Sequence, residues 1–147
     1  DGDKQFRAYD MNEVARYYAA SEDVAEFLAH YPERHDFREE AGGNRVFINV
    51  WCWEHAWKIR VTENGRELPV RREQTEDPLY VISYDIPQSV WKGKYPVDYG
   101  KRGKQHTLFT VDASGPATTL EIEVTDSFGK VYRETMTRPK AFGPQMK

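Results

Sequence analysis

Histidine side chains are the residues of this sequence best suited to metal binding or to proton transfer near neutral pH. They are His30, His35, His55 and His106. Their spacing matches none of the paired patterns, such as HExxH, that bring two ligands to one face of a helix. Because Pro32 lies between the first two, these do not share a helix face. We therefore expect solvated or capping histidines, and we predict no metal site and no cofactor in this chain.

No recognisable motif positions a nucleophile or a phosphate. The sequence contains no G-x-S-x-G elbow, and Gly42-Gly43 precedes a predicted strand, whereas a phosphate-binding loop precedes a helix. Cys52 is the single cysteine and lies among apolar neighbours in a predicted strand, so we expect a buried, unreactive thiol. The alternating Glu121 and Glu123 indicate the solvated face of an amphipathic strand. We predict no catalytic residue in this chain.

Aromatic side chains are the remaining indication of a binding site, because 14% of the residues are Phe, Trp or Tyr. Trp51 and Trp57 fall in predicted strands, where we expect them to fill the core. Trp91, Tyr95 and Tyr99 instead fall in a long irregular segment. Since loops of this length are often functional and exposed aromatics stack on sugars and other small molecules, these three residues form a candidate site for a glycan or small-molecule ligand.

The elements that must position these side chains are mostly strands. Residues 5–31 predict a short strand and two helices, with Asp10 and Ser21 as the helix caps. From residue 45 to 137 the apolar residues alternate with a period of two, and Asn64-Gly65 is typical of a tight hairpin. The pattern predicts about seven strands, among them residues 79–86, with residues 71–77 as a polar loop. The expected fold is mostly β: an antiparallel β-sandwich, immunoglobulin-like by strand count, after a short two-helix segment.

The strand that begins near residue 45 differs from the others because both of its faces are apolar. Val46, Ile48 and Val50 point to one side, whereas Phe47 points to the other. A strand of this kind is covered on both faces. We expect the two preceding helices to cover the face that does not pack inside the sandwich.

Composition limits the classes of partner. The chain has 147 residues, the size of one domain, and we treat residues 1–147 as a single domain. The formal net charge of −3 and the lack of a long basic run exclude a typical nucleic-acid-binding surface. No apolar stretch approaches the roughly 20 residues of a membrane span. The chain starts without Met, so we expect it to be a piece of a longer protein.

Three segments together resemble one known family. They are residues 9–14 (YDMNEV), residues 45–53 (RVFINVWCW), and residues 124–132 (VTDSFGKVY) continuing through 135–140 (TMTRPK). Each resembles the C-terminal domain of bacterial calcineurin-like phosphoesterases. The similarity extends from about residue 5 to the end, and the last segment is the most specific.

The resemblance implies an accessory role. In that family the domain follows a catalytic domain whose two metals are held by motifs of the types D-x-H, G-D, G-N-H-[DE] and G-H-x-H. None of these occurs here, and Gly43-Asn44 is followed by Arg45. The resemblance therefore implies a parent that is a metal-dependent phosphoesterase hydrolase, commonly exported to the periplasm, and a catalytic domain as the intramolecular partner of this non-catalytic piece.

Two alternatives remain open beside this leading hypothesis. The first is a carbohydrate-binding module that uses Trp91, Tyr95 and Tyr99. The second is a small enzyme with an unfamiliar site, which requires His55, His106 and a carboxylate to converge in one pocket.

Overall fold

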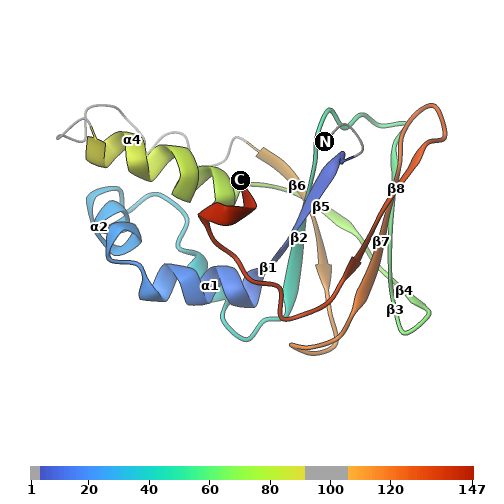
Figure 1. Cartoon of the computed structure of the whole chain (residues 1–147), viewed down its shortest axis with the longest axis horizontal. Helices are drawn as coiled ribbons and strands as arrows, with labels where there is room; N and C mark the ends of the chain where they lie inside the picture. The colour runs from blue at the N-terminus through green and yellow to red at the C-terminus, as the bar shows by residue number, and fades with distance from the viewer. Residues whose placement is uncertain (1–3, 92–105) are drawn as a thin grey trace.

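The computed structural model describes residues 4–91 and 106–147. Within these residues, two four-stranded antiparallel sheets pack face to face, and a helical layer covers the outer face of one of them (Figure 1). The prediction of a mostly β, antiparallel sandwich is confirmed, although the described chain contains eight strands where about seven were expected. None of the described helices combines the length and the hydrophobicity that a membrane crossing requires.

The strands divide evenly between the two sheets. In sheet A the order is β1 (Phe6–Asp10), β2 (Arg45–Val50), β6 (His106–Asp112) and β5 (Arg71–Thr75). In sheet B the order is β4 (Arg66–Leu68), β3 (Lys58–Glu63), β7 (Leu120–Thr125) and β8 (Val131–Met136). Each sheet therefore mixes early and late strands, so the two halves of the chain fold together into one unit.

The helical layer consists of short segments from three parts of the chain. They are α1 (Met11–Ala20), α2 (Glu22–His30), the 3-10 turn η1 (Phe37–Glu40), the continuous run of α3 (Pro78–Tyr80), the π-helical η2 (Val81–Asp85) and α4 (Ile86–Trp91), and the C-terminal turn η4 (Pro144–Met146). In Figure 1 the C-terminal segment leaves β8 and returns to this layer. Phe142 is buried there against the rings of Tyr9 and Tyr17.

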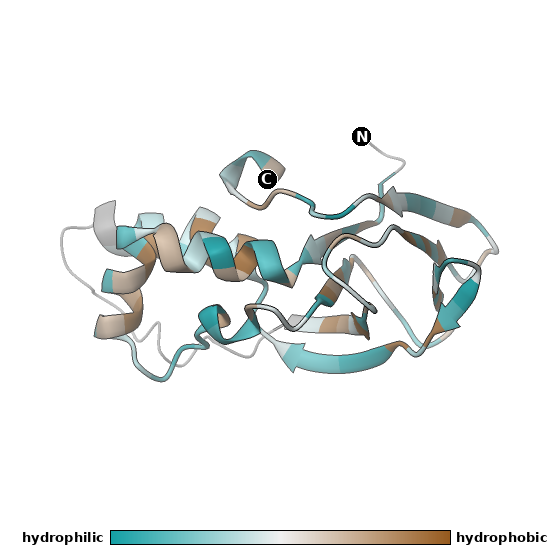
Figure 2. Cartoon of the chain, turned by 90° about the horizontal axis from the view of Figure 1, so that it is seen from below, coloured by the Kyte–Doolittle hydropathy of each residue, from teal (hydrophilic) through white to brown (hydrophobic). Residues whose placement is uncertain are grey.

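Sheet A lies between two hydrophobic cores because its strands are apolar on both faces. Val46 and Ile48 of β2 are buried in the core between the sheets, whereas Phe47 is buried in the core under the helices. Phe109 and Leu108 of β6 divide in the same way. Hydrophobic stretches accordingly recur in helices and strands alike (Figure 2). The prediction that the first two helices cover the second face of β2 is confirmed.

The start of each N-terminal helix is set by a side chain that the sequence predicts as a cap. The Asp10 carboxylate accepts a hydrogen bond from the amide of Asn12 (3.2 Å), and the Ser21 hydroxyl accepts one from the amide of Val24 (3.2 Å). Such caps satisfy amides that have no partner within the helix. Glu13, in the first turn of α1, forms an ion pair with Arg16 (3.3 Å).

The hairpin between β3 and β4 forms as predicted. Asn64 and Gly65 have φ angles of 52° and 77°, the left-handed conformations that a type I′ turn requires at both central positions. The turn sets a register in which Val61 pairs with Leu68, and both side chains point into the core between the sheets.

Two segment predictions are wrong. Residues 79–86 form a helix, whereas their apolar residues predicted a strand; Asp77 caps its start and Pro78 occupies its first turn. Residues 71–75, predicted as a polar loop, form β5 at the edge of sheet A, where residues 71–74 are exposed. Charged residues are common on edge strands because they prevent pairing with other chains, so the polar pattern concealed the strand.

Candidate functional site

One end of the sandwich gathers several segments that are distant in the sequence. Phe6, which begins β1, pairs with Val50, which ends β2, and Lys58, which begins β3, pairs with Thr125, which ends β7. The start of β1, the turn at residues 51–57 and the turn at residues 126–130 therefore share this end, which we call the N-terminal end. In Figure 1 the start of β1 lies beside the turn that follows β2.

A cleft opens at this end, lined by residues of sheet A and of the helical layer. Its volume is about 630 Å³, within the range of 300–1,000 Å³ typical of small-molecule sites. We call it the Arg7 cleft. Its lining includes Arg7, Asn49, Trp51, Cys52, Asp77, Tyr80, Tyr84 and Lys147.

The floor of the Arg7 cleft is built by adjacent strands. Arg7 of β1 pairs in register with Asn49 of β2, and its guanidinium lies 5.2 Å from the centroid of the Trp51 ring. A cation over an aromatic face is attracted by the ring quadrupole, which holds the guanidinium in place. The Arg7 Nε is buried and has no hydrogen-bond partner among the described residues. The cleft therefore contains a fixed cationic donor with unused capacity.

Asp77 connects this floor to the helix above it. Its carboxylate accepts hydrogen bonds from the side-chain amide of Asn49 (2.6 Å) through one oxygen and from the backbone amide of Leu79 (2.9 Å) through the other. Burial and the negative charge of Asp77 raise the pKa of the Tyr9 phenol, which lies beneath. Since both oxygens of Asp77 are engaged, the carboxylate is held against sheet A.

The wall of the cleft is aromatic. The rings of Tyr80 and Tyr84 lie 5.0 Å apart at an angle of 33°, and each side chain keeps about 40% of its surface exposed. The ammonium group of Lys147 lies 4.6 Å from the Tyr84 ring centroid. Two cations held on aromatic rings thus border a cleft with flat walls, which is an arrangement suited to binding a small anion.

A second polar cluster lies inside the helical layer. The Arg34 guanidinium pairs with Glu76 through Nε and with Asp85 through Nη2 (2.7 Å), and all three side chains are at least 96% buried. Glu76 also accepts a hydrogen bond from the backbone amide of His35 (2.7 Å). Burial raises the pKa of Glu76, and the charge of Arg34 opposes that rise. Because its opposite charges pair with one another away from solvent, this cluster joins η2 to the segment after α2 and offers no open position for a substrate.

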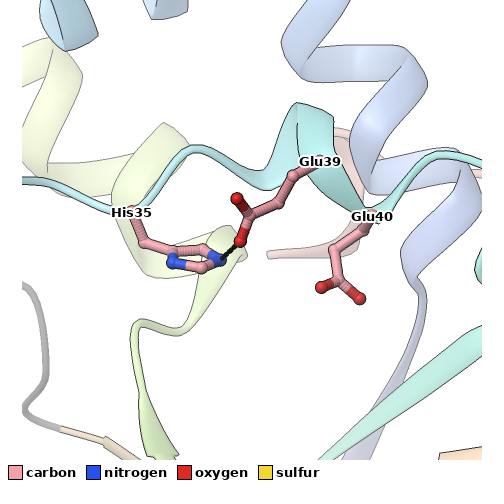
Figure 3. A group of neighbouring side chains, drawn as sticks. All are labelled: His35, Glu39 and Glu40. Atoms are coloured by element: carbon pink, nitrogen blue, oxygen red, sulfur yellow. Dashed lines mark ion pairs between the residues drawn. The ribbon is translucent and has the colours of Figure 1, made fainter.

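A third cluster has the residue types of a metal site. The ligand atoms of His35, Glu39 and Glu40 lie within 4.8 Å of one another, and the imidazole of His35 pairs with Glu39 (3.2 Å; Figure 3). However, the Nε of Arg45 lies 3.4 Å from the Glu40 carboxylate, and Arg45 also pairs with Glu73 (2.7 Å). A guanidinium at this position supplies the positive charge that a metal ion would bring, and burial raises the pKa of Glu40.

Comparison with known families identifies the chain. A family model described as the C terminal of calcineurin-like phosphoesterase matches residues 1–132. The chain belongs to this family. No curated protein matches, and no solved structure matches. The family resemblance seen in three sequence segments is thus confirmed. The family model covers most of this phosphoesterase C-terminal domain.

Both of the sites that the sequence suggested in this phosphoesterase C-terminal domain stay predictions. Tyr95, Tyr99 and the side chain of Trp91 lie outside the described residues, so the proposed glycan site is not tested. The His106 side chain also lies outside them, whereas the His55 ring lies 5.1 Å from that of Trp53. The convergence of the two histidines is therefore equally untested.

The predictions for Cys52 and Trp51 are wrong. β2 ends at Val50, and Cys52 lies in the following turn with a φ of 56° and an exposed side chain. The alternation that predicted a buried thiol does not continue past the strand. Trp51 is half-buried in the wall of the Arg7 cleft, whereas Trp57 packs against the core between the sheets as expected.

Sequence reasoning also missed Arg7, Tyr80 and Tyr84, the residues that define the cleft of this family member. The predicted strand at residues 79–86 would place the two tyrosines on one face but about 13 Å apart, too far for their rings to meet. A helix places residues four apart next to each other. Asp77-Pro78, a capping residue followed by a proline in the first turn, is the sequence feature that could have identified this helix.

Proposed function

We propose that this chain is a non-catalytic accessory domain that packs on the catalytic domain of a calcineurin-like metallophosphoesterase through its N-terminal end and shapes one side of the substrate cleft. Membership of the C-terminal family supports this proposal because it relates the chain to proteins that contain such a catalytic domain. A polypeptide that leads from a preceding domain would enter the sandwich at the start of β1. The Arg7 cleft opens at that same end.

The observation that best supports docking at this end is the position of Phe128. Its side chain is 95% exposed at the tip of the turn between β7 and β8. The turn is rigid because the Asp126 carboxylate accepts hydrogen bonds from the amides of Phe128 (2.9 Å) and Lys130 (3.0 Å). A large apolar side chain held out in water by a fixed turn gives a docked domain apolar surface to bury.

The polar clusters of the described residues support a non-catalytic role. Arg34 is neutralised by Glu76 and Asp85, and the Glu40 carboxylate is neutralised by Arg45. Such groups stabilise a fold and are not arranged to activate a water molecule. We expect the purified chain, given Mn²⁺ and bis(p-nitrophenyl) phosphate, to hydrolyse this ester no faster than the metal alone. Hydrolysis at the rate of an enzyme would contradict the non-catalytic assignment.

Docking is tested by placing Phe128→Ser in the full-length protein and in this chain alone. Loss of an apolar contact buried between domains costs about 1–3 kcal/mol, so the variant should lower the unfolding midpoint of the full-length protein. In the isolated chain the same change should have almost no effect, since Phe128 contacts mainly solvent there. Arg66→Ser, in the hairpin at the opposite end of the sandwich, is the control and should leave both proteins unchanged. Equal effects of Phe128→Ser in both proteins would rule out docking through this turn.

The periplasmic location implied by the resemblance is likewise a proposal. Fractionation of cells that express the full-length protein tests it directly.

A further inference from the structure

We propose that the Arg7 cleft is a binding site for a small ligand that carries an anionic oxygen group next to a ring, with Arg7 as the residue that holds the anion. The cleft is lined by residues of this chain, so a ligand can bind there whether or not this surface also borders a catalytic domain.

The first step is the unused donor on Arg7. Its Nε is buried and donates no hydrogen bond to a described residue, although the Tyr9 phenol lies beside the guanidinium. A buried donor without a partner costs free energy that an incoming acceptor recovers. Guanidinium groups favour carboxylate and phosphate oxygens because the planar fork matches their geometry.

The second step is the charge of the lining. Among the described lining residues, Arg7 and Lys147 carry cationic side chains and Asp77 an anionic one, and in the 147-residue chain the terminal carboxylate of Lys147 adds a second negative charge. Asp77 does not satisfy Arg7, because its two oxygens accept hydrogen bonds from Asn49 and from the amide of Leu79. Both cations lie over aromatic rings, Arg7 over Trp51 and Lys147 over Tyr84, and neither forms an ion pair with a described residue. An anion in the cleft would therefore meet two positive groups in fixed positions.

The third step is the space around the anion. The volume of about 630 Å³ exceeds what a free phosphate ion needs, and the walls beside the cations include Trp51, Tyr80 and Tyr84. Aromatic walls with a few polar groups are typical of sites for organic molecules. We therefore infer an oxyanionic ester or acid with an attached ring, and not a free ion.

Calorimetric titration of the 147-residue chain with three matched probes tests the ligand class. Phenyl phosphate carries the full ligand chemistry, benzoate replaces phosphate by carboxylate, and phenyl β-glucoside keeps the ring but has no charge. We expect phenyl phosphate to bind. Its affinity should fall when salt is added, because the attraction is electrostatic. Binding of benzoate with equal affinity would identify the site as a general oxyanion site. The neutral glucoside should not bind; a glucoside that bound as tightly as the phosphate would overturn the proposal in favour of a sugar site.

Variants then assign the site to the cleft. Arg7→Gln should weaken binding of phenyl phosphate about 10- to 100-fold, the range expected for loss of a charged hydrogen-bond donor. Arg72→Gln is the matched control: the Arg72 guanidinium lies 5.0 Å from the Trp53 ring, also stacked on a tryptophan, but outside the cleft. It should bind as the unmodified chain does. Equal losses in both variants, or none in either, would overturn the assignment.

Folding is controlled by circular dichroism and by a second variant. Lys147→Gln changes a side chain outside both hydrophobic cores, so it should fold normally and weaken binding several-fold through the lost charge. If Arg7→Gln fails to fold, this variant decides the question: unchanged affinity for phenyl phosphate would overturn the proposal.

Discussion

The Nε of Arg138 lies 3.5 Å from the Oδ2 of Asp10, and neither side chain is accessible to solvent. Asp10 ends β1 and caps α1, whereas Arg138 follows β8 near the end of the chain. The Arg138 guanidinium also donates hydrogen bonds to the carbonyl of Gly115 (2.8 Å) and the hydroxyl of Thr118 (3.0 Å). This pair therefore fastens the helical layer, sheet A and sheet B together. Asp10 lies within the residues that match the family model, whereas Arg138 lies beyond them.

Arg138→Ala should lower the free energy of unfolding by about 3–5 kcal/mol, because it leaves the buried Asp10 carboxylate without a charged partner and with only backbone amides as donors. Chemical denaturation followed by tryptophan fluorescence measures the change. Arg133→Ala is the control, since Arg133 pairs with Glu123 at 3.1 Å on the surface of sheet B and remains 66% exposed. Exposed pairs contribute little, so the control should change stability by less than about 1 kcal/mol. Similar losses of stability from the two substitutions would show that the buried pair of Arg138 with Asp10 contributes no more than an exposed ion pair.

Asp77→Ala should destabilise the chain by about 1–3 kcal/mol, because it removes a helix cap and leaves the Asn49 amide without its acceptor. Thermal unfolding monitored by circular dichroism measures the loss. Asp36→Ala provides a comparison, since Asp36 caps the short η1 turn on the surface and keeps 41% of its side chain exposed. The comparison variant should lose clearly less stability. An Asp77→Ala chain as stable as the original would mean that the cap does not anchor α3 to sheet A.

The sequence predicts best where local geometry and tertiary structure agree. Asn64-Gly65 forms its hairpin because the left-handed conformation at both residues is a local requirement that no distant contact opposes. Ser21 caps α2 for a similar reason. The two-sided apolar pattern of β2 also predicts correctly that the strand lies between two layers, since both faces must be buried by some element.

The failures have a different physical origin. Residues 79–86 contain Val81, Ile82 and Ile86, whose side chains favour strands by propensity. Tertiary packing overrides this preference, because a helix buries all three against α1 and α2 in one core. The Arg7 cleft could not be predicted from the sequence pattern either. It is formed by β1, β2 and the helix starting at Pro78, which contact one another only in the folded chain.

Mn²⁺ or Zn²⁺ should leave the unfolding midpoint of the chain unchanged. A ligand that binds the folded state stabilises it in proportion to its affinity, but at His35, Glu39 and Glu40 the neighbouring Arg45 opposes a second positive charge. Thermal scans with and without each metal provide the measurement. If a metal did raise the midpoint, His35→Ala would locate it. Loss of the effect in that variant would establish a metal site where we predict none.

The last prediction concerns the pH dependence of stability at Glu40. Burial raises the pKa of this carboxyl in the folded state above its value in the unfolded chain, about 4.3. Between these two pKa values the folded state keeps a proton that the unfolded state has released, so the contribution of Glu40 to stability falls as the pH rises through the window. Glu40→Gln removes this titration and resembles the protonated acid.

The free energies of unfolding of Glu40→Gln and the unmodified chain should therefore be similar below about pH 4 and should diverge in favour of the variant as the pH rises. Denaturant titrations at a series of pH values measure the difference. Glu39→Gln is the control, because the Glu39 side chain is 63% exposed, and its profile should stay parallel to that of the unmodified chain. A parallel profile for Glu40→Gln as well would mean that the attraction of Arg45 cancels the cost of burying the Glu40 charge.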